Sequence, residues 1–139
     1  RPMSARISAT DWAPGGLDLA EATQIARALK EHGLDIIDVS TGQTVAEAQP
    51  QYGRMFQVPY SDAIRNDVGL RTMTVGAITT ADQINTIITS SRADICLLAR
   101  EHLRDPAFTL RAASQQGYLD ISWPKQYFMG KPLPRLSTS

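Results

Sequence analysis

The feature that most constrains the fold is a regular alternation of short apolar runs and helical patterns. The apolar runs, partly β-branched, occupy residues 5–9, 35–40, 71–76 and 93–99. The helical segments that follow them begin near Asp18, Ser61, Thr80 and Asp105. Strands that alternate with helices form parallel sheets with right-handed crossovers. The sequence therefore predicts an α/β chain made of four βα units.

Helix-start signals support three of these segments. Asp18 precedes an apolar period and is followed by Glu21, so its carboxylate is predicted to accept a hydrogen bond from the first turn. Thr80 with Gln83 gives the pattern of a capping box. Asp105 before Pro106 predicts an N-cap followed by proline at the first helical position.

Four βα units leave two architectures open. One is a small open sheet, and the other is half of an eight-unit barrel, which normally needs roughly 250 residues, whereas the chain has 139. A half-barrel would expose its sheet edges and its inner face, for which we expect Ile7, Ile37 and Met73. If the chain is a half-barrel, we expect it to occupy residues 1–117, followed by a C-terminal tail at residues 118–139.

Composition excludes several function classes. Lys and Arg number 14, as do Asp and Glu, so the net charge is zero and a basic surface for nucleic acid is not expected. No apolar run approaches the roughly 18 residues of a membrane helix. The single cysteine, Cys96, excludes an internal disulfide and is expected to be a buried, inert thiol. We expect a cytoplasmic protein without a metal site.

Polar residues gather where the apolar runs end, at the edge of a parallel α/β sheet that carries ligands. Gly76 would let a ligand approach the backbone, and Arg100 would offer a planar fork to phosphate. The alternative is that Gly76 only forms a turn and Arg100 is a surface cation.

The first two runs also carry polar candidates. Arg6, inside a short strand, either faces a ligand or pairs with a carboxylate such as Asp38. Ser40 either contacts a ligand or caps the strand end. The polar segment 41–59 is too long for a simple turn, which makes it a candidate functional loop.

Several stretches match a known family in order and spacing, from Arg6 to about Ala113. They are residues 6–12, 16–18, 35–42, 75–78 and 93–106, the last of which ends in a specific Arg-Asp-Pro. These stretches resemble the old yellow enzyme family of FMN-dependent NAD(P)H:flavin oxidoreductases, and most closely its xenobiotic-reductase branch. That family is a TIM barrel, so the resemblance implies that the chain is the C-terminal four βα units, a half-barrel fragment.

The resemblance also implies roles for cofactor-binding residues. Arg6 would point at the pyrimidine edge of the flavin, and Ser40 would lie near the ribityl chain and phosphate. The phosphate would be cradled by Val75, Gly76, Ala99 and Arg100. Many relatives have glycine where Ala99 stands, which makes the approach to the phosphate tighter here.

The family's substrate-anchoring residues and its proton-donating Tyr lie in the other half of the barrel, so no catalytic residue is expected in this chain. The implied function is the FMN-binding part of an oxidoreductase. It would take hydride from NAD(P)H and pass it, through flavin N5, to an activated alkene or aromatic thioester. Its partner would be the missing N-terminal half. The alternatives are a self-associating, catalytically incomplete half-barrel and a small α/β phospholigand-binding module.

The tail carries one further resemblance. Residues 123–131 are similar to a subset in which this barrel is fused behind a flavin monooxygenase domain. That subset includes the salicylyl-CoA 5-hydroxylase and aminobenzoyl-CoA monooxygenase type. The resemblance implies that the chain comes from such a fusion.

Overall fold

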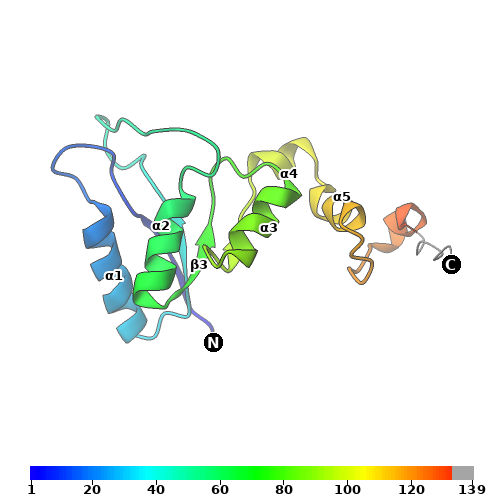
Figure 1. The fold of residues 1–139 in the computed structure, drawn as a ribbon, viewed down its shortest axis with the longest axis horizontal. Coiled ribbons are helices and arrows are strands. Elements are labelled where there is room, and N and C mark those ends of the chain that lie inside the picture. Colours follow the sequence, from blue (N-terminus) through cyan, green and yellow to red (C-terminus); the bar gives the residue numbers. More distant parts are fainter. Residues whose placement is uncertain (133–139) are drawn as a thin grey trace. The chain divides into compact units, whose positions relative to one another are not determined.

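The computed structural model describes residues 1–132 and divides the chain into two compact units, Arg1–Leu98 and Ala99–Ser139. The first unit contains all the strands that the structure assigns in residues 1–132 (Figure 1). Its elements are β1 (Ser4–Ser8), α1 (Leu19–Glu31), β2 (Ile36–Ser40), α2 (Val58–Ala63), the π-helical η1 (Ile64–Val68), β3 (Arg71–Thr74), α3 (Ala81–Thr89) and β4 (Ile95–Cys96). The boundary at residue 117 stays a prediction.

The second unit is helical in its described part. It contains α4 (Arg100–Arg104), α5 (Phe108–Gln115) and the 3-10 helix η2 (Lys125–Gly130). The prediction that Asp105 and Pro106 begin a helix was wrong, because the carbonyl of Asp105 accepts a hydrogen bond from the N–H of Phe108 at 3.0 Å. The Asp105 carboxylate also accepts from the N–H of Ala107 at 3.1 Å. Residues 106 and 107 therefore form a turn, and α5 begins directly after it, at Phe108.

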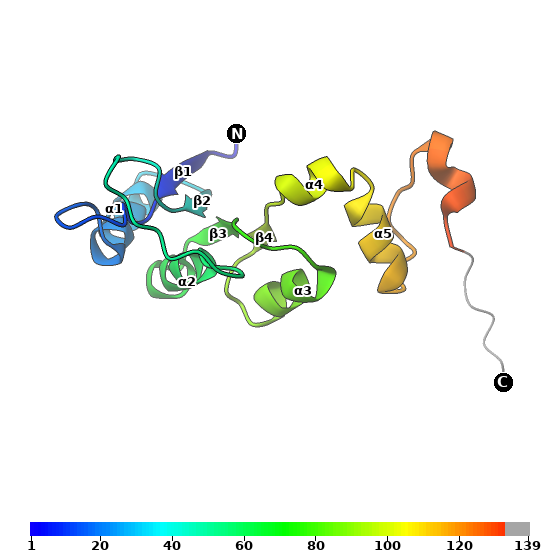
Figure 2. The same ribbon diagram turned by 90° about the horizontal axis from the view of Figure 1, so that it is seen from above.

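The four strands form one parallel sheet in the order β1-β2-β3-β4, which confirms the α/β prediction. Each strand pairs with the next along the chain, so right-handed crossovers place every connecting helix on the same face. Figure 2 shows α1, α2 and α3 on one side of the strands. The other face of the sheet carries no helix of this unit.

The register separates the residues of these two faces. One row across the sheet is Arg6, Asp38, Met73 and Ile95, which we call the open-face row. Met73 lies in this row as expected, but Ile7 and Ile37 do not, so their assignment to the inner face was wrong. Both pack in the core under the helices, where Ile37 is 0% exposed. The cause is the period of two in a strand, which sends Ile7 to the face opposite Arg6.

Two strands are shorter than predicted. β3 ends at Thr74 because Gly76 adopts φ +105°, a left-handed conformation that a strand does not accommodate. β4 covers only Ile95 and Cys96 of the predicted residues 93–99, since β3 ends at Thr74 and these two residues pair with Met73 and Thr74. The hydrogen bonds from Asp94 N to Thr72 O and from Leu97 N to Thr74 O flank this short ladder.

Helical signals in the sequence were mostly correct. The carboxylate of Asp18 accepts from the N–H of Glu21, as predicted, and the Glu21 side chain in turn accepts from the N–H of Asp18, which completes a capping box. Thr80 accepts from the N–H of Gln83, whose side chain reaches Thr79 and not Thr80. The second helix starts at Val58, three residues before the predicted Ser61, because a proline is acceptable in the first turn of a helix.

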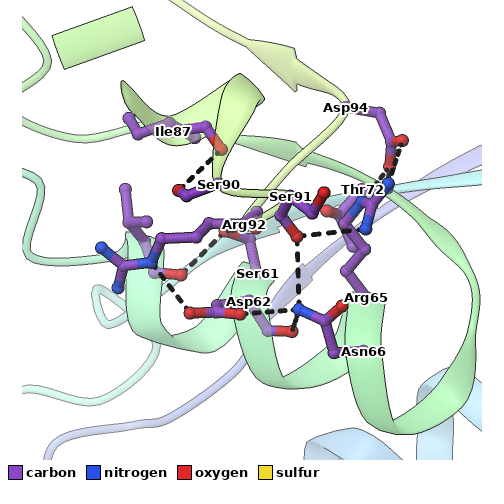
Figure 3. A network of polar contacts seen from close by, with 11 residues as sticks. Ser61, Asp62, Arg65, Asn66, Thr72, Ile87, Ser90, Ser91, Arg92 and Asp94 are labelled. Carbon is purple, nitrogen blue, oxygen red and sulfur yellow. Dashed lines mark hydrogen bonds and ion pairs between the residues drawn. The ribbon is translucent and has the colours of Figure 1, made fainter. Parts of the chain in front are cut away.

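A polar network holds the amino edge of the sheet, where β3 and β4 begin (Figure 3). Arg65 binds both carboxylate oxygens of Asp94 at 3.1 Å, and Asp94 also accepts from the N–H of Thr72 at 2.9 Å. Arg92 pairs with Asp62 at 2.8 Å. Partial burial acts to raise the pKa of Asp94, but its hydrogen bonds to Arg65 and Thr72 and the charges of Arg65 and Arg71 hold that pKa below its usual range. This edge is thus built from paired charges.

Candidate functional site

Arg6 lies in β1 on the open face of the sheet. Its Nε donates to Oδ2 of Asp38 at 2.6 Å, so the ion pair that the sequence offered as an alternative is present. The Arg6 side chain is nevertheless 59% exposed, while that of Asp38 is 12% exposed. Within residues 1–132, neither Nη atom of Arg6 has a hydrogen-bond partner. Asp38 therefore fixes the guanidinium through one nitrogen and leaves its two terminal groups for another acceptor.

Ser40 ends β2, and its hydroxyl donates to the carbonyl of Ile7 at 3.0 Å. This bond ties the carboxyl ends of β1 and β2 together, which agrees with a capping role. A hydroxyl that donates one hydrogen bond still has lone pairs with which to accept another. The ligand contact implied for Ser40 stays a prediction.

The turn after β3 brings Val75 and Gly76 to the carboxyl edge of the sheet. Gly76 has φ +105° and the following Ala77 has φ +51°. A Cβ atom at Gly76 would lie 2.3 Å from Nε2 of Gln57 and 2.9 Å from Cε1 of Phe56. Glycine is thus required here by both conformation and space. Among residues 1–132, no hydrogen-bond acceptor faces the N–H of Gly76.

Gln57 is a site residue that sequence reasoning missed. Its side chain links Thr41, just after β2, to Val75, just after β3, and the residue is only 5% exposed. A buried glutamine whose side chain is hydrogen-bonded to two strand ends is a structural centre of the site. The one signal that pointed toward it was the unusual length of the polar segment 41–59.

The loops after β1 and β2 are also joined at this edge. Asp11 accepts hydrogen bonds from the hydroxyl of Thr44 and from the N–H of Leu17 at 2.8 Å. These two bonds, the one from Thr44 first, lower the pKa of Asp11. Gly42, at φ +74°, lies against the indole of Trp12, where an added Cβ would approach Cδ1 to 3.1 Å. The two loops therefore form one connected rim.

Ala99 and Arg100 belong to the second compact unit. Ala99 is the residue before α4, and Arg100 is the first residue of that helix. Both are exposed, and Arg100 makes no ion pair within the described part of the chain. Their predicted place beside Val75 and Gly76 stays a prediction.

Within residues 1–132, the structure offers no catalytic partner for Cys96 and no metal site. Cys96 is half-buried, and this burial raises the pKa of its thiol to about 11, so it is protonated at neutral pH. No group of three or more His, Cys, Asp and Glu side chains in the described residues is arranged to hold a metal. No helix there has the length and apolar character needed to cross a membrane.

Comparison with known proteins identifies the class. The model of the NADH:flavin oxidoreductase / NADH oxidase family matches residues 1–118, and the chain belongs to this family. The family uses FMN as cofactor and NAD(P)H as electron donor, as the resemblance implied.

Particular relatives are NADPH dehydrogenases. The protein of that name from Listeria monocytogenes is 43% identical over 126 residues, which are 91% of this chain and 37% of the relative. Those from Bacillus pumilus and Halalkalibacterium halodurans are 39% and 40% identical over the same length. The chain thus spans about 37% of the length of the curated relatives that it matches.

Proposed function

We propose that this chain is the cofactor-holding part of an FMN-dependent NAD(P)H oxidoreductase, formed by the C-terminal four βα units of a TIM barrel. The observation that carries the proposal is Arg6, whose guanidinium is fixed by Asp38 on the open face of the sheet. In an intact barrel this face is the interior, and the carboxyl edge holds the ligand site.

The groups on this edge and on the open face fit FMN. FMN carries a dianionic phosphate and an electron-rich pyrimidine edge, and both need hydrogen-bond donors. The N–H of Gly76 and the two Nη groups of Arg6 are such donors, and none of them has an acceptor in residues 1–132. We assign the pyrimidine edge to Arg6, and the ribityl chain and phosphate to Ser40, Val75, Gly76, Ala99 and Arg100.

When bound, FMN supplies hydride transfer between NAD(P)H and an acceptor through its N5 atom. The task of Arg6 is to hold a positive charge where the reduced cofactor is anionic, an electrostatic stabilisation that enzymes use widely. Asp38 keeps the guanidinium in place for this task. Substrate anchoring and proton donation are assigned to the rest of the barrel, and the acceptor class is an activated alkene or aromatic thioester.

The open-face row also supports the proposed partner. Asp38 is nearly buried, while Ile95, at the β4 end of the same row, is 45% exposed. An exposed apolar residue beside unpaired sheet edges favours association. We assign this face to the N-terminal half of the barrel, and to a second copy of the chain when that half is missing.

Flavin binding tests the proposal. The protein at its full natural length is titrated with FMN while flavin fluorescence is recorded, and NAD(P)H oxidation is followed with an α,β-unsaturated carbonyl acceptor. We expect saturable FMN binding and acceptor-dependent oxidation. In Arg6→Met, affinity should fall by about tenfold, the size of one charge-assisted hydrogen bond. Arg6→Lys, which keeps the charge, should fall less. No binding of FMN at saturating concentration would overturn the proposal.

A further inference from the structure

The carboxamide of Gln57 makes three hydrogen bonds at the carboxyl edge of the sheet. Its Oε1 accepts from the N–H of Thr41 at 2.5 Å and from the Thr41 hydroxyl at 2.9 Å. Its Nε2 donates to the carbonyl of Val75 at 2.9 Å. Because Gln57 is 95% buried, these bonds are shielded from water and fix the side chain in one orientation.

The bond to Val75 sets the direction of the next N–H. The peptide between Val75 and Gly76 is trans, like all described peptides of the chain, and a planar trans peptide points its C=O and N–H in opposite directions. With the carbonyl turned toward Gln57, the N–H of Gly76 is turned away from it. This is the same N–H that has no acceptor within residues 1–132.

The side chains of Gln57 and Phe56 pack closely against this turn. The position of a Cβ at Gly76 is taken by Nε2 of Gln57, only 2.3 Å away. The glycine and the glutamine are therefore matched: the missing side chain of Gly76 makes room for the carboxamide that orients its own peptide.

We infer that Gln57 is a positioning residue, which aims the Gly76 N–H at the terminal phosphate of the bound cofactor. The inference rests on the proposed function. Gln57 lies outside the strands and turns that the family resemblance assigned to the cofactor. Gln57 does not touch the phosphate but sets the donor that does.

The test compares two flavins that differ only in the phosphate. The protein at full length is titrated with FMN and with riboflavin, and the ratio of the two affinities measures the contribution of the phosphate site. Gln57→Met keeps the size of the side chain but removes its hydrogen bonds. We expect this ratio to fall by about tenfold while riboflavin affinity is retained, since one oriented donor to a charged group is lost.

Two further variants separate positioning from general loss of structure. Ser61→Ala removes a fully buried hydroxyl that bonds the carbonyls of Val58 and Arg92, close to Gln57 in sequence. It should lower the thermal midpoint and leave the affinity ratio unchanged. Thr41→Val removes one of the two donors to Gln57 and should lower the ratio by less than Gln57→Met does. It supplies the test if Gln57→Met does not fold.

The outcomes are distinguishable. If the wild-type protein binds neither flavin, the proposed function fails and this inference fails with it. If the wild type prefers FMN and Gln57→Met or Thr41→Val keeps the full preference, this inference alone is overturned. Equal loss of FMN and riboflavin affinity in Gln57→Met would also overturn it, because the side chain would then support the whole pocket.

Discussion

The two ends of the parallel sheet use their polar groups in opposite ways. At the amino edge, Asp94 accepts from Arg65 and from the N–H of Thr72, so both of its oxygens are bonded. At the carboxyl edge, the N–H of Gly76 has no acceptor in residues 1–132, and neither do the Nη groups of Arg6 on the open face of the sheet. The polar groups of the amino edge thus bond one another and stabilise the fold. At the carboxyl edge, the N–H of Gly76 is held in a fixed direction and is left for another acceptor.

The largest expected effect comes from filling the space at Gly76. Gly76→Ala would place a Cβ against Gln57 at a positive φ, so the free energy of unfolding should fall by about 3 kcal/mol, the sum of backbone strain and overpacking. Urea denaturation of the full-length protein measures this loss, and flavin titration should show weaker FMN binding. Gly53→Ala is the control, because its Cβ meets nothing within 4 Å. Equal stability of the two variants would contradict the packing described here.

A smaller effect is expected at the opposite edge. Asp94→Ala removes the carboxylate to which both Arg65 and the N–H of Thr72 donate. The side chain of Asp94 is 27% exposed and that of Arg65 is 28% exposed. The free energy of unfolding should fall by about 2 kcal/mol, because a partly buried guanidinium and an N–H lose their acceptor. The FMN-to-riboflavin affinity ratio should not change. A changed ratio would show that the two edges are not independent.

The smallest effect is a dependence on pH. The pKa of Asp94 is lowered in the folded protein, so its contribution to stability is complete above the unfolded pKa of about 3.9. It is lost as the pH falls through the lower folded value. Urea midpoints between about pH 3 and pH 7 should therefore decrease below pH 4 in the wild type. The decrease should be smaller in Asp94→Asn. Equal dependence of the urea midpoint on pH in the two proteins would show that Asp94 does not contribute to stability in acid.

Local signals were sufficient to predict much of the fold. The cap at Asp18 and the apolar period after it specify α1 without reference to the rest of the chain. The ends of the strands were less predictable, since the length of β4 depends on where its partner β3 ends. The assignment of Ile7 and Ile37 to the inner face was wrong because period-two alternation alone does not say which face the helices cover.

The residues of the site differ in the same way in how well the sequence predicted them. The pair of Arg6 and Asp38 was among the alternatives, because two central positions of adjacent parallel strands face each other. Gln57 was not, because its partners Thr41 and Val75 are 16 and 18 residues away and nothing in a single sequence marks them. The roles assigned to Ser40, Ala99 and Arg100 stay predictions.

The strand order has a consequence for how the molecule is made. Each strand pairs with the strand before it, and the paired residues Arg6 and Asp38 are only 32 positions apart. Within residues 1–132, no strand is inserted between two strands that come earlier in the chain. Because synthesis proceeds from the amino end and short sequence separations favour rapid pairing, the sheet can grow one βα unit at a time as the chain leaves the ribosome.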